Sequence, residues 1–258
     1  AAAGAIEAVV AALQTHPQVA AVQADGCSAL SNVCFSDDAA APARRQRVAA
    51  AGAIEDMVAA MRAHPQEESV QQQGSCALAN VCEGDDAAAP ARRQRAAGAG
   101  AIEEVVAAMR AHPQEENVQE YSCCALANMC HGDDAAAQTR RQRAAAAGAI
   151  EQVVAAMSAH LYVVDMQEDG CAALRDMCTG DDAAGPARRQ RAAAAGAIEA
   201  VVEALRAHPH WSAVQEQGCS ALANVCDGDD AAGAACSQRA AAAGAIEAVV
   251  AALQTHPQ

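Results

Sequence analysis

The sequence predicts an all-α protein made of one helical unit repeated along the chain. The tripeptide Gly-Ala-Ile begins at Gly4, Gly52, Gly100, Gly148, Gly196 and Gly244. The pattern therefore returns every 48 residues, and a fixed period of this kind indicates stacked repeats. Alanine dominates the composition, whereas Phe, Trp and Tyr supply 1, 1 and 2 of the 258 residues. Closely packed helices suit such a composition better than strands do.

The unit that starts at Asp85 divides into three helices. Asp85 and Asp86 are expected to cap the first helix, and Pro90 suits its first turn. Gly100 can adopt the left-handed conformation that ends this helix. A second helix is expected over residues 101–112 and a third over residues 116–130, with Pro113 between them.

The second and third helices each carry an apolar stripe at helical spacing. In the second helix the stripe consists of Ile102, Val105, Val106 and Met109. In the third it consists of Val118, Ser122, Ala125, Leu126 and Met129. One unit is too small to bury its own stripe, so neighbouring units must stack. We therefore expect a single repeat domain over residues 1–258, with five full periods and an eighteen-residue partial unit.

These motifs resemble a known family. The pattern GAI-x-x-VV-x-x-M/L, followed by VQ-x-x-G/S-x-x-AL-x-N, is similar to the armadillo repeat over the whole chain. The resemblance implies a right-handed α-solenoid, in which a short first helix precedes two longer antiparallel helices. The units are longer than usual for this family, and we expect the additional residues in the GDDAAAPA turn. The related HEAT repeat is the nearest alternative, but it lacks the short helix that ends in Gly.

The resemblance also implies a binding surface. In armadillo proteins the third helices line a groove, where a ladder of Asn residues holds the backbone of an extended peptide. The matching positions here are Asn32, Asn80, Asn128, Asp176 and Asn224. An Asn amide can both donate and accept, whereas the ionised Asp can only accept. The alternative interpretation is that these residues stabilise helix ends and neighbouring turns.

Recognition of basic nuclear-localisation peptides is not supported. Family members with that function place Trp four residues before the Asn, where this chain has Ser28, Cys76, Cys124, Ala172 and Ser220. Acidic residues do occur on or near the third helix, namely Asp25, Glu120, Glu168, Asp169, Asp176 and Glu216. Such a groove would favour a cationic partner segment.

The rare aromatic residues are further candidates for partner contacts. The fourth unit departs from the pattern with Leu161 in place of Pro, and the fifth unit contains the only Trp. The candidates are Tyr121, Tyr162, Arg175 and Trp211. Aromatic side chains on an alanine-rich surface can anchor an interface. The alternative is local packing that fills the space of the missing Pro.

Cysteine and histidine also recur with the period. Cys34, Cys82, Cys130, Cys178 and Cys226 share one position, which predicts buried thiols and a reducing, cytoplasmic compartment, with nuclear and organellar locations left open. Cys236 replaces a repeated Arg, which makes it a candidate for an exposed, reactive thiol. A His ends every second helix, at His16, His64, His112, His160, His208 and His256. Because nothing distinguishes a Cys–His pair in one unit from those in the others and no zinc-like spacing occurs, we expect no enzyme, metal or cofactor.

The RRQR clusters are basic but are not expected to bind nucleic acid. The formal net charge is −15, which repels phosphates, and the chain contains no apolar run long enough to cross a membrane. The clusters could line a basic ridge, but we expect them to be neutralised across units by a repeated glutamate. These glutamates are Glu7, Glu55, Glu103, Glu151 and Glu199.

The sequence thus predicts a non-enzymatic protein-interaction scaffold, with an extended peptide along the third helices. The alternative is an architectural subunit of a larger assembly, held through its edges and ends. Residues 1–18 and 241–258 are identical, and both carry the apolar stripe of a second helix. Natural solenoids end in polar capping units. We therefore expect a longer natural protein, or ends that are covered by a partner or by each other.

Overall fold

The structure is a computed structural model that describes residues 4–35, 38–228 and 231–255. These residues form sixteen α-helices and no strand, which confirms the all-α prediction. The chain divides into two compact units, Ala1–Gly132 and Asp133–Gln258, and each is described by itself. None of the described helices is both long and apolar enough to cross a membrane.

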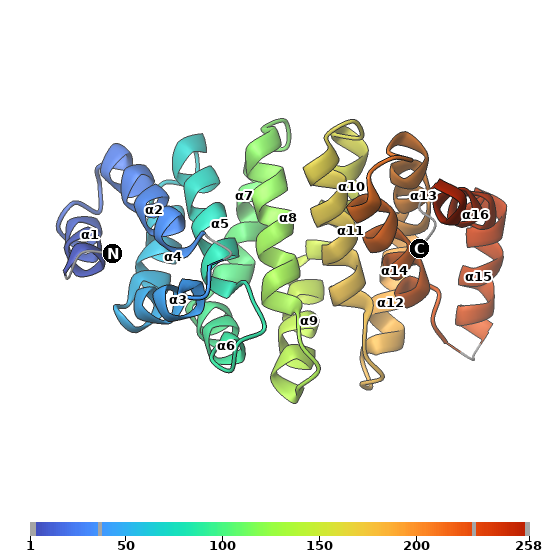
Figure 1. Ribbon diagram of the computed structural model, residues 1–258, viewed down its shortest axis with the longest axis horizontal. Coiled ribbons are helices and arrows are strands. Elements are labelled where there is room, and N and C mark those ends of the chain that lie inside the picture. Colours follow the sequence, from blue (N-terminus) through green and yellow to red (C-terminus); the bar gives the residue numbers. More distant parts are fainter. Residues whose placement is uncertain (1–3, 36–37, 229–230, 256–258) are drawn as a thin grey trace. The chain divides into compact units, whose positions relative to one another are not determined.

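The first compact unit contains eight helices in the described residues (Figure 1). They are α1 (Ala5–Thr15), α2 (Ala20–Cys34), α3 (Ala41–Ala50), α4 (Ala53–Ala63), α5 (Glu68–Cys82), α6 (Ala89–Ala99), α7 (Ala101–Ala111) and α8 (Glu116–Cys130). We call α3 and α6 first helices, α1, α4 and α7 second helices, and α2, α5 and α8 third helices. Each third helix packs against the second helix before it, and the three third helices pack in the order α2, α5, α8.

The second compact unit repeats this arrangement. Its helices are α9 (Ala135–Ala147), α10 (Ala149–Ala159), α11 (Val164–Cys178), α12 (Gly185–Ala195), α13 (Ala197–Ala207), α14 (Ser212–Val225), α15 (Ala231–Ala243) and α16 (Ala245–Thr255). Here α9, α12 and α15 are first helices, α10, α13 and α16 second helices, and α11 and α14 third helices. The third helices α11 and α14 pack against each other.

The predicted helix boundaries agree with the structure, with one correction. Gly100 has φ of 96°, ends α6 and begins α7, and a side chain at this left-handed position would be strained. The third helix matches residues 116–130. However, Asp85 and Asp86 do not cap α6, whose N-cap is Ala88, because they lie one turn earlier. In the next unit Asp134 does cap α9, since its carboxylate accepts a hydrogen bond from the Ala137 N–H at 2.7 Å.

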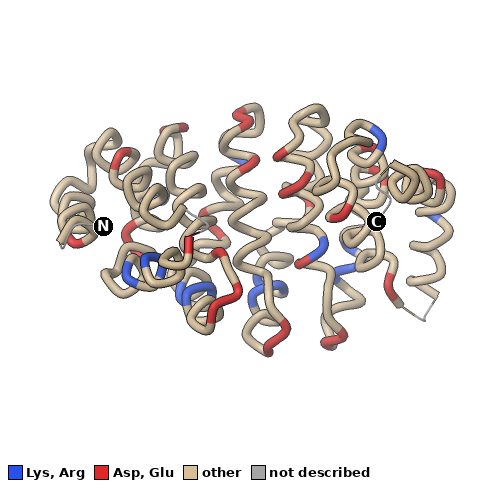
Figure 2. Tube along the Cα trace, in the orientation of Figure 1, with Lys and Arg blue, Asp and Glu red and all other residues tan. Residues whose placement is uncertain are grey.

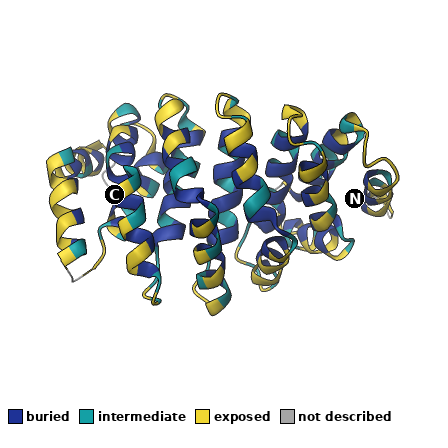
Figure 3. Ribbon diagram, turned by 180° about the vertical axis from the view of Figure 1, so that it is seen from behind, coloured by how far each residue is buried: buried dark blue, intermediate teal, exposed yellow. Residues whose placement is uncertain are grey.

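Both predicted stripes are buried. All nine stripe residues of α7 and α8 are 0% exposed. In Figure 3 the buried residues lie where helices meet and the exposed residues lie on outward faces. The core therefore runs between the second and third helices of each repeat.

A buried glutamine fastens each third helix to its second helix. Gln71 donates from Nε2 to the carbonyls of Met61 and His64, both at 2.9 Å. These carbonyls lie at the end of α4, where backbone oxygens lack partners within the helix. The same bonds recur at Gln23, Gln119, Gln167 and Gln215.

The repeated histidine links neighbouring repeats. His64 Nε2 lies 2.8 Å from the carbonyl of Pro17, and His112 Nε2 lies 2.9 Å from that of Pro65. A carbonyl only accepts, so the ring nitrogen donates in both contacts. His208 makes the equivalent contact to Leu161 at 2.7 Å, whereas His256 lies outside the described residues.

The RRQR arginines are divided between two tasks. The last Arg pairs with the second helix of the preceding repeat, as in Arg95 Nε to Glu55 Oε1 at 2.7 Å, which confirms the predicted pairing across units. The first Arg binds within its own repeat instead: Arg92 is 1% exposed and binds Asp86 at 2.7 Å, whereas its counterpart Arg44 is 22% exposed. Figure 2 shows basic positions gathered on the first helices, with acidic positions in the segments around them. These arginines lie in the middle of the helix, and the buried ones cannot contribute to a basic ridge.

The twelve cysteines are thiols, and most are buried. Burial raises the pKa of Cys171 and of Cys178 to about 12, so both are protonated and unreactive at neutral pH. Cys226 is only half-buried, unlike the other members of its series. The expected exposure of Cys236 was wrong: it is 9% exposed because it faces inward, into a hollow of about 370 Å³ that Gln190 and Val225 also line.

Candidate functional site

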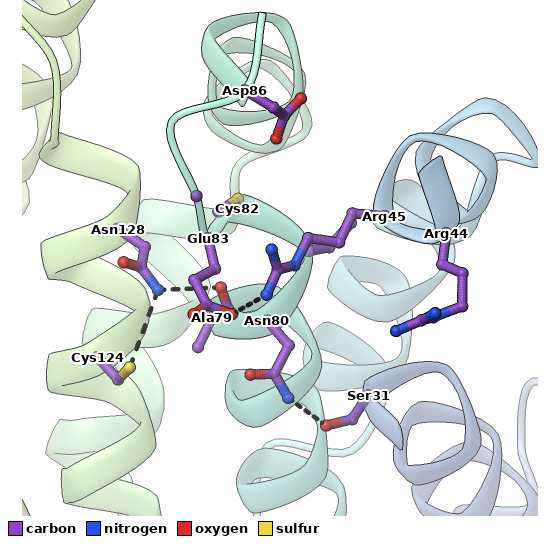
Figure 4. A network of polar contacts seen from close by, with 12 residues as sticks. Ser31, Arg44, Arg45, Ala79, Asn80, Cys82, Glu83, Asp86, Cys124 and Asn128 are labelled. Atoms are coloured by element: carbon purple, nitrogen blue, oxygen red, sulfur yellow. Dashed lines mark hydrogen bonds and ion pairs between the residues drawn. The ribbon is translucent and has the colours of Figure 1, made fainter. Parts of the chain in front are cut away.

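The third helices carry the predicted ladder, and Figure 4 shows two of its members, Asn80 and Asn128, on the adjacent helices α5 and α8. Asn80 on α5 and Asn128 on α8 are half-buried in the first compact unit, and Asn32 on α2 is exposed. In the second unit, Asp176 lies on α11 and Asn224 on α14.

The Asn side chains donate to the preceding third helix. Asn128 Nδ2 donates to the Ala79 carbonyl at 3.1 Å, and Asn224 Nδ2 donates to the Arg175 carbonyl at 3.0 Å. Asn80 Nδ2 donates instead to the hydroxyl of Ser31 at 2.8 Å. These bonds orient the amides and join neighbouring repeats. They favour the stabilising interpretation. In Asn80 and Asn128 the amide nitrogen also donates to Cys76 and Cys124, so for these two residues the amide oxygen is the group that a peptide could use, as an acceptor.

The departure at Asp176 comes with a compensating change. Arg175 donates from Nε and Nη2 to the two carboxylate oxygens of Asp176, at 3.0 and 2.7 Å. The hydrogen bond and charge of this Asp raise the pKa of Arg175. Asp176 is only 5% exposed, so the pair keeps a buried charge neutralised. Arg175 also binds Gln217 of α14 and so joins the two third helices.

Two of the predicted acidic residues of the second compact unit, Glu168 and Glu216, lie near each other and near Asp165. Partial burial is the main cause that raises the pKa of Glu168, and the nearby negative charges of Asp165 and Glu216 add to it. In the first unit, Asp25 is exposed and Glu120 is half-buried. A cation placed beside Glu168 would relieve this mutual repulsion.

The two aromatic candidates of the second unit point into solvent. Tyr162 is 83% exposed and Trp211 is 56% exposed. Exposure on this scale does not fit the alternative of local packing. Tyr121 on α8 is half-buried.

Two features of this surface were missed from sequence. Ser31 accepts the hydrogen bond of Asn80, although it stands where other units have Ala or Arg. Phe35 is 71% exposed directly after α2, and its being the only Phe of the chain could have drawn attention to it. Among the described residues, no group of three or more His, Cys, Asp or Glu side chains could hold a metal ion.

Comparison with models of known protein families and with curated proteins found no match for this chain.

Proposed function

We propose that this chain is an armadillo-like, right-handed α-solenoid with a period of 48 residues and that it works as a non-enzymatic protein-interaction scaffold. The observation that carries the proposal is the set of oriented amides on neighbouring third helices. Asn128 and Asn224 each donate to a carbonyl of the preceding third helix. The oxygen of each amide can then accept a hydrogen bond from the backbone of an extended peptide.

The charge of this surface supports a cationic peptide. Partial burial raises the pKa of Glu168 and the nearby charges of Asp165 and Glu216 raise it further, whereas the two charges of Arg175 and Asp176 neutralise each other. Lys or Arg side chains of a bound segment would lower the repulsion among these carboxylates. We expect no nucleic-acid partner because of the net charge of −15. A reducing compartment such as the cytoplasm fits the twelve thiols.

The test is selection from a library of extended peptides, followed by binding measurements with the double variant Asn80→Ala/Asn128→Ala. The matched control is Gln46→Ala/Gln94→Ala, which removes two exposed amides from the first helices. We expect the ladder variant to lose binding by at least about tenfold and the control to bind normally, with affinity that falls as salt rises. Circular dichroism confirms that both variants are folded. Unchanged binding by the folded ladder variant would show that the ladder does not hold the peptide.

A second candidate function is that of an architectural subunit in a larger assembly. It is favoured by the exposure of Tyr162 and Trp211 on the second compact unit. Replacement of both residues by Ala should then release partners that the ladder variant retains, because aromatic anchors dominate such interfaces. Retention of the partners by the Tyr162→Ala/Trp211→Ala variant would argue against this function.

A further inference from the structure

Two helices of identical sequence bury opposite faces. Residues 5–15 in α1 and 245–255 in α16 both read AIEAVVAALQT. In α1 the buried residues are Ile6, Val10 and Leu13. In α16 the buried residues are Ala245, Ala248 and Ala252.

The apolar stripe of α16 is exposed. Ile246 is 62%, Val250 46% and Leu253 69% exposed, whereas Leu13, the counterpart of Leu253, is 2% exposed. The internal second helix α4 buries both faces, including Ala53, Ile54 and Met61. Each of the identical helices therefore buries only one of the two faces that an internal second helix buries.

The exposed apolar face of α16 borders an elongated groove in the second compact unit. Two adjoining hollows of about 410 and 440 Å³ lie between α14 and α16 and share Cys219. Leu222, Ile246 and Val250 line the first hollow, and Leu253 lines the second. In the complete repeats, the equivalent position is filled by a third helix. This helix packs on its own second helix and on the preceding third helix, as α5 does on α4 and α2.

We propose that α2 of a second copy of this chain occupies this groove, with α16 of the first copy taking the place of α1. The chain already contains the contact in question, because α2 covers the same stripe in α1. At Gly26 of α2, an added Cβ would lie 2.5 Å from Leu13 Cδ2, which shows how closely the two helices approach. Leu253 would approach Gly26 of the second copy in the same way.

The polar contacts of α1 are also available from α16. Arg47 binds Glu7 at 3.0 Å, and Gln14 donates to Asp56 at 3.1 Å. The counterparts of Glu7 and Gln14 in α16 are Glu247 and Gln254, both exposed. Exchange of α1 for α16 therefore replaces the apolar contacts of the stripe and these polar pairs with identical ones.

Assembly is favoured by an additional contact between third helices. In the exchanged arrangement, α2 of the second copy would pack on α14 as α14 packs on α11, which continues an interface that the chain already has. Asn224 donates to the carbonyl of Arg175, 49 residues before it. The same register would bring Asn32 of the second copy to the carbonyl of Ala223, and both residues are exposed in the single chain.

Such a contact joins unlike surfaces, so it continues from copy to copy instead of closing. This inference concerns the ends of the chain and holds whether or not the third helices bind a peptide. It predicts that the average mass in sedimentation experiments rises with concentration beyond that of a dimer.

The test uses two full-length variants, each of which blocks one end. Leu253→Asp blocks the groove and Asn32→Arg blocks α2; both positions are exposed, so folding should be preserved. We expect each variant alone to be monomeric. An equimolar mixture should form a one-to-one dimer and nothing larger, because one open end remains on each variant.

The matched control is Ala251→Glu, which adds the same charge to α16. Its counterparts Ala59 and Glu203 are exposed in complete repeats, so the control should assemble like the unaltered chain. In the assembly, hydrogen exchange should become faster in α1 and slower in α16, and peptides that extend beyond residue 18 or start before residue 241 distinguish the two sequences.

Three results would overturn the proposal. The first is an unaltered chain that stays monomeric at every concentration, since something other than a second copy would then cover α16. The second is assembly that persists in the Leu253→Asp variant. The third is a mixture of the two end-blocked variants that stays monomeric or grows beyond a dimer.

Discussion

Replacement of the buried Arg92 by Met should destabilise the protein strongly. The Arg92 side chain is 1% exposed and donates to the carbonyls of Val81 and Glu83 at 2.8 and 2.9 Å. It also donates to both carboxylate oxygens of Asp86, at 2.9 and 2.7 Å. Met fills a similar volume but leaves one carboxylate and two carbonyls without their donor. Because Asp86 is itself 21% exposed and keeps its hydrogen bond from the Ala88 N–H at 3.0 Å, loss of the ion pair and of the two carbonyl bonds should cost about 2–4 kcal/mol of unfolding free energy.

The chain provides a matched control in Arg44, the counterpart of Arg92 in the preceding repeat. Its side chain is 22% exposed and donates to the Val33 carbonyl at 2.8 Å and to one oxygen of Asp38 at 3.0 Å. Because Asp38 is itself 56% exposed, water can replace the lost partner. Arg44→Met should therefore lower the unfolding free energy by only about 1 kcal/mol.

The assay is urea unfolding at neutral pH, followed by circular dichroism. The double variant Arg92→Met/Asp86→Asn removes the stranded charge and should recover about 1–2 kcal/mol relative to Arg92→Met alone. Equal costs for Arg92→Met and Arg44→Met would refute the argument from burial. A double variant no more stable than Arg92→Met would refute the argument from the stranded carboxylate.

The remaining predictions concern acid stability, the buried glutamines and the thiols. Hydrogen bonds from arginine lower the pKa of Asp86 and of Asp182 to about 2, below the unfolded value, so their contribution is present above about pH 4 and lost as the pH falls toward 2. This contribution to the unfolding free energy should amount to about 1–2 kcal/mol per site. Acid titration tests it, because the unfolding free energy of the Asp86→Asn and Asp182→Asn variants should depend less on pH. Gln71→Ala should cost about 1–3 kcal/mol in urea unfolding, against about 0.5 kcal/mol or less for the neighbouring Gln72→Ala; equal costs would contradict the role of the two carbonyl bonds. Cys171, whose pKa burial raises to about 12, should resist alkylation until urea unfolds the chain, and mass spectrometry of the labelled protein would reveal any earlier modification.

Much of the fold could be predicted because it depends on local rules. Gly100 ends one helix and begins the next because a left-handed residue is needed there, and Pro113 separates the second and third helices. The spacing of Ile102 and Val118 within their stripes places both in the core. These features depend on a few neighbouring residues, which the sequence displays directly.

The candidate site depended more on contacts between repeats. The positions of the Asn ladder could be read from the motif, but the use of the Asn128 amide as a donor to Ala79 could not, since these residues are 49 positions apart. The pairing of Asp176 with its neighbour Arg175 was also missed, because adjacent helical residues ordinarily point in different directions. The burial of Cys236 depends on tertiary structure, because its side of α15 faces a hollow that Val225 and Gln190 also line.

Residues 5–15 and 245–255 separate the two kinds of information most clearly. The sequence AIEAVVAALQT by itself determined that both segments are amphipathic helices that follow a left-handed Gly. It could not determine that Leu13 is 2% exposed and Leu253 69% exposed. Only the tertiary structure decided this, because α2 lies on the stripe of α1 and no described helix lies on that of α16. Helix formation follows from bonds within the segment, whereas burial depends on what the rest of the chain places beside it.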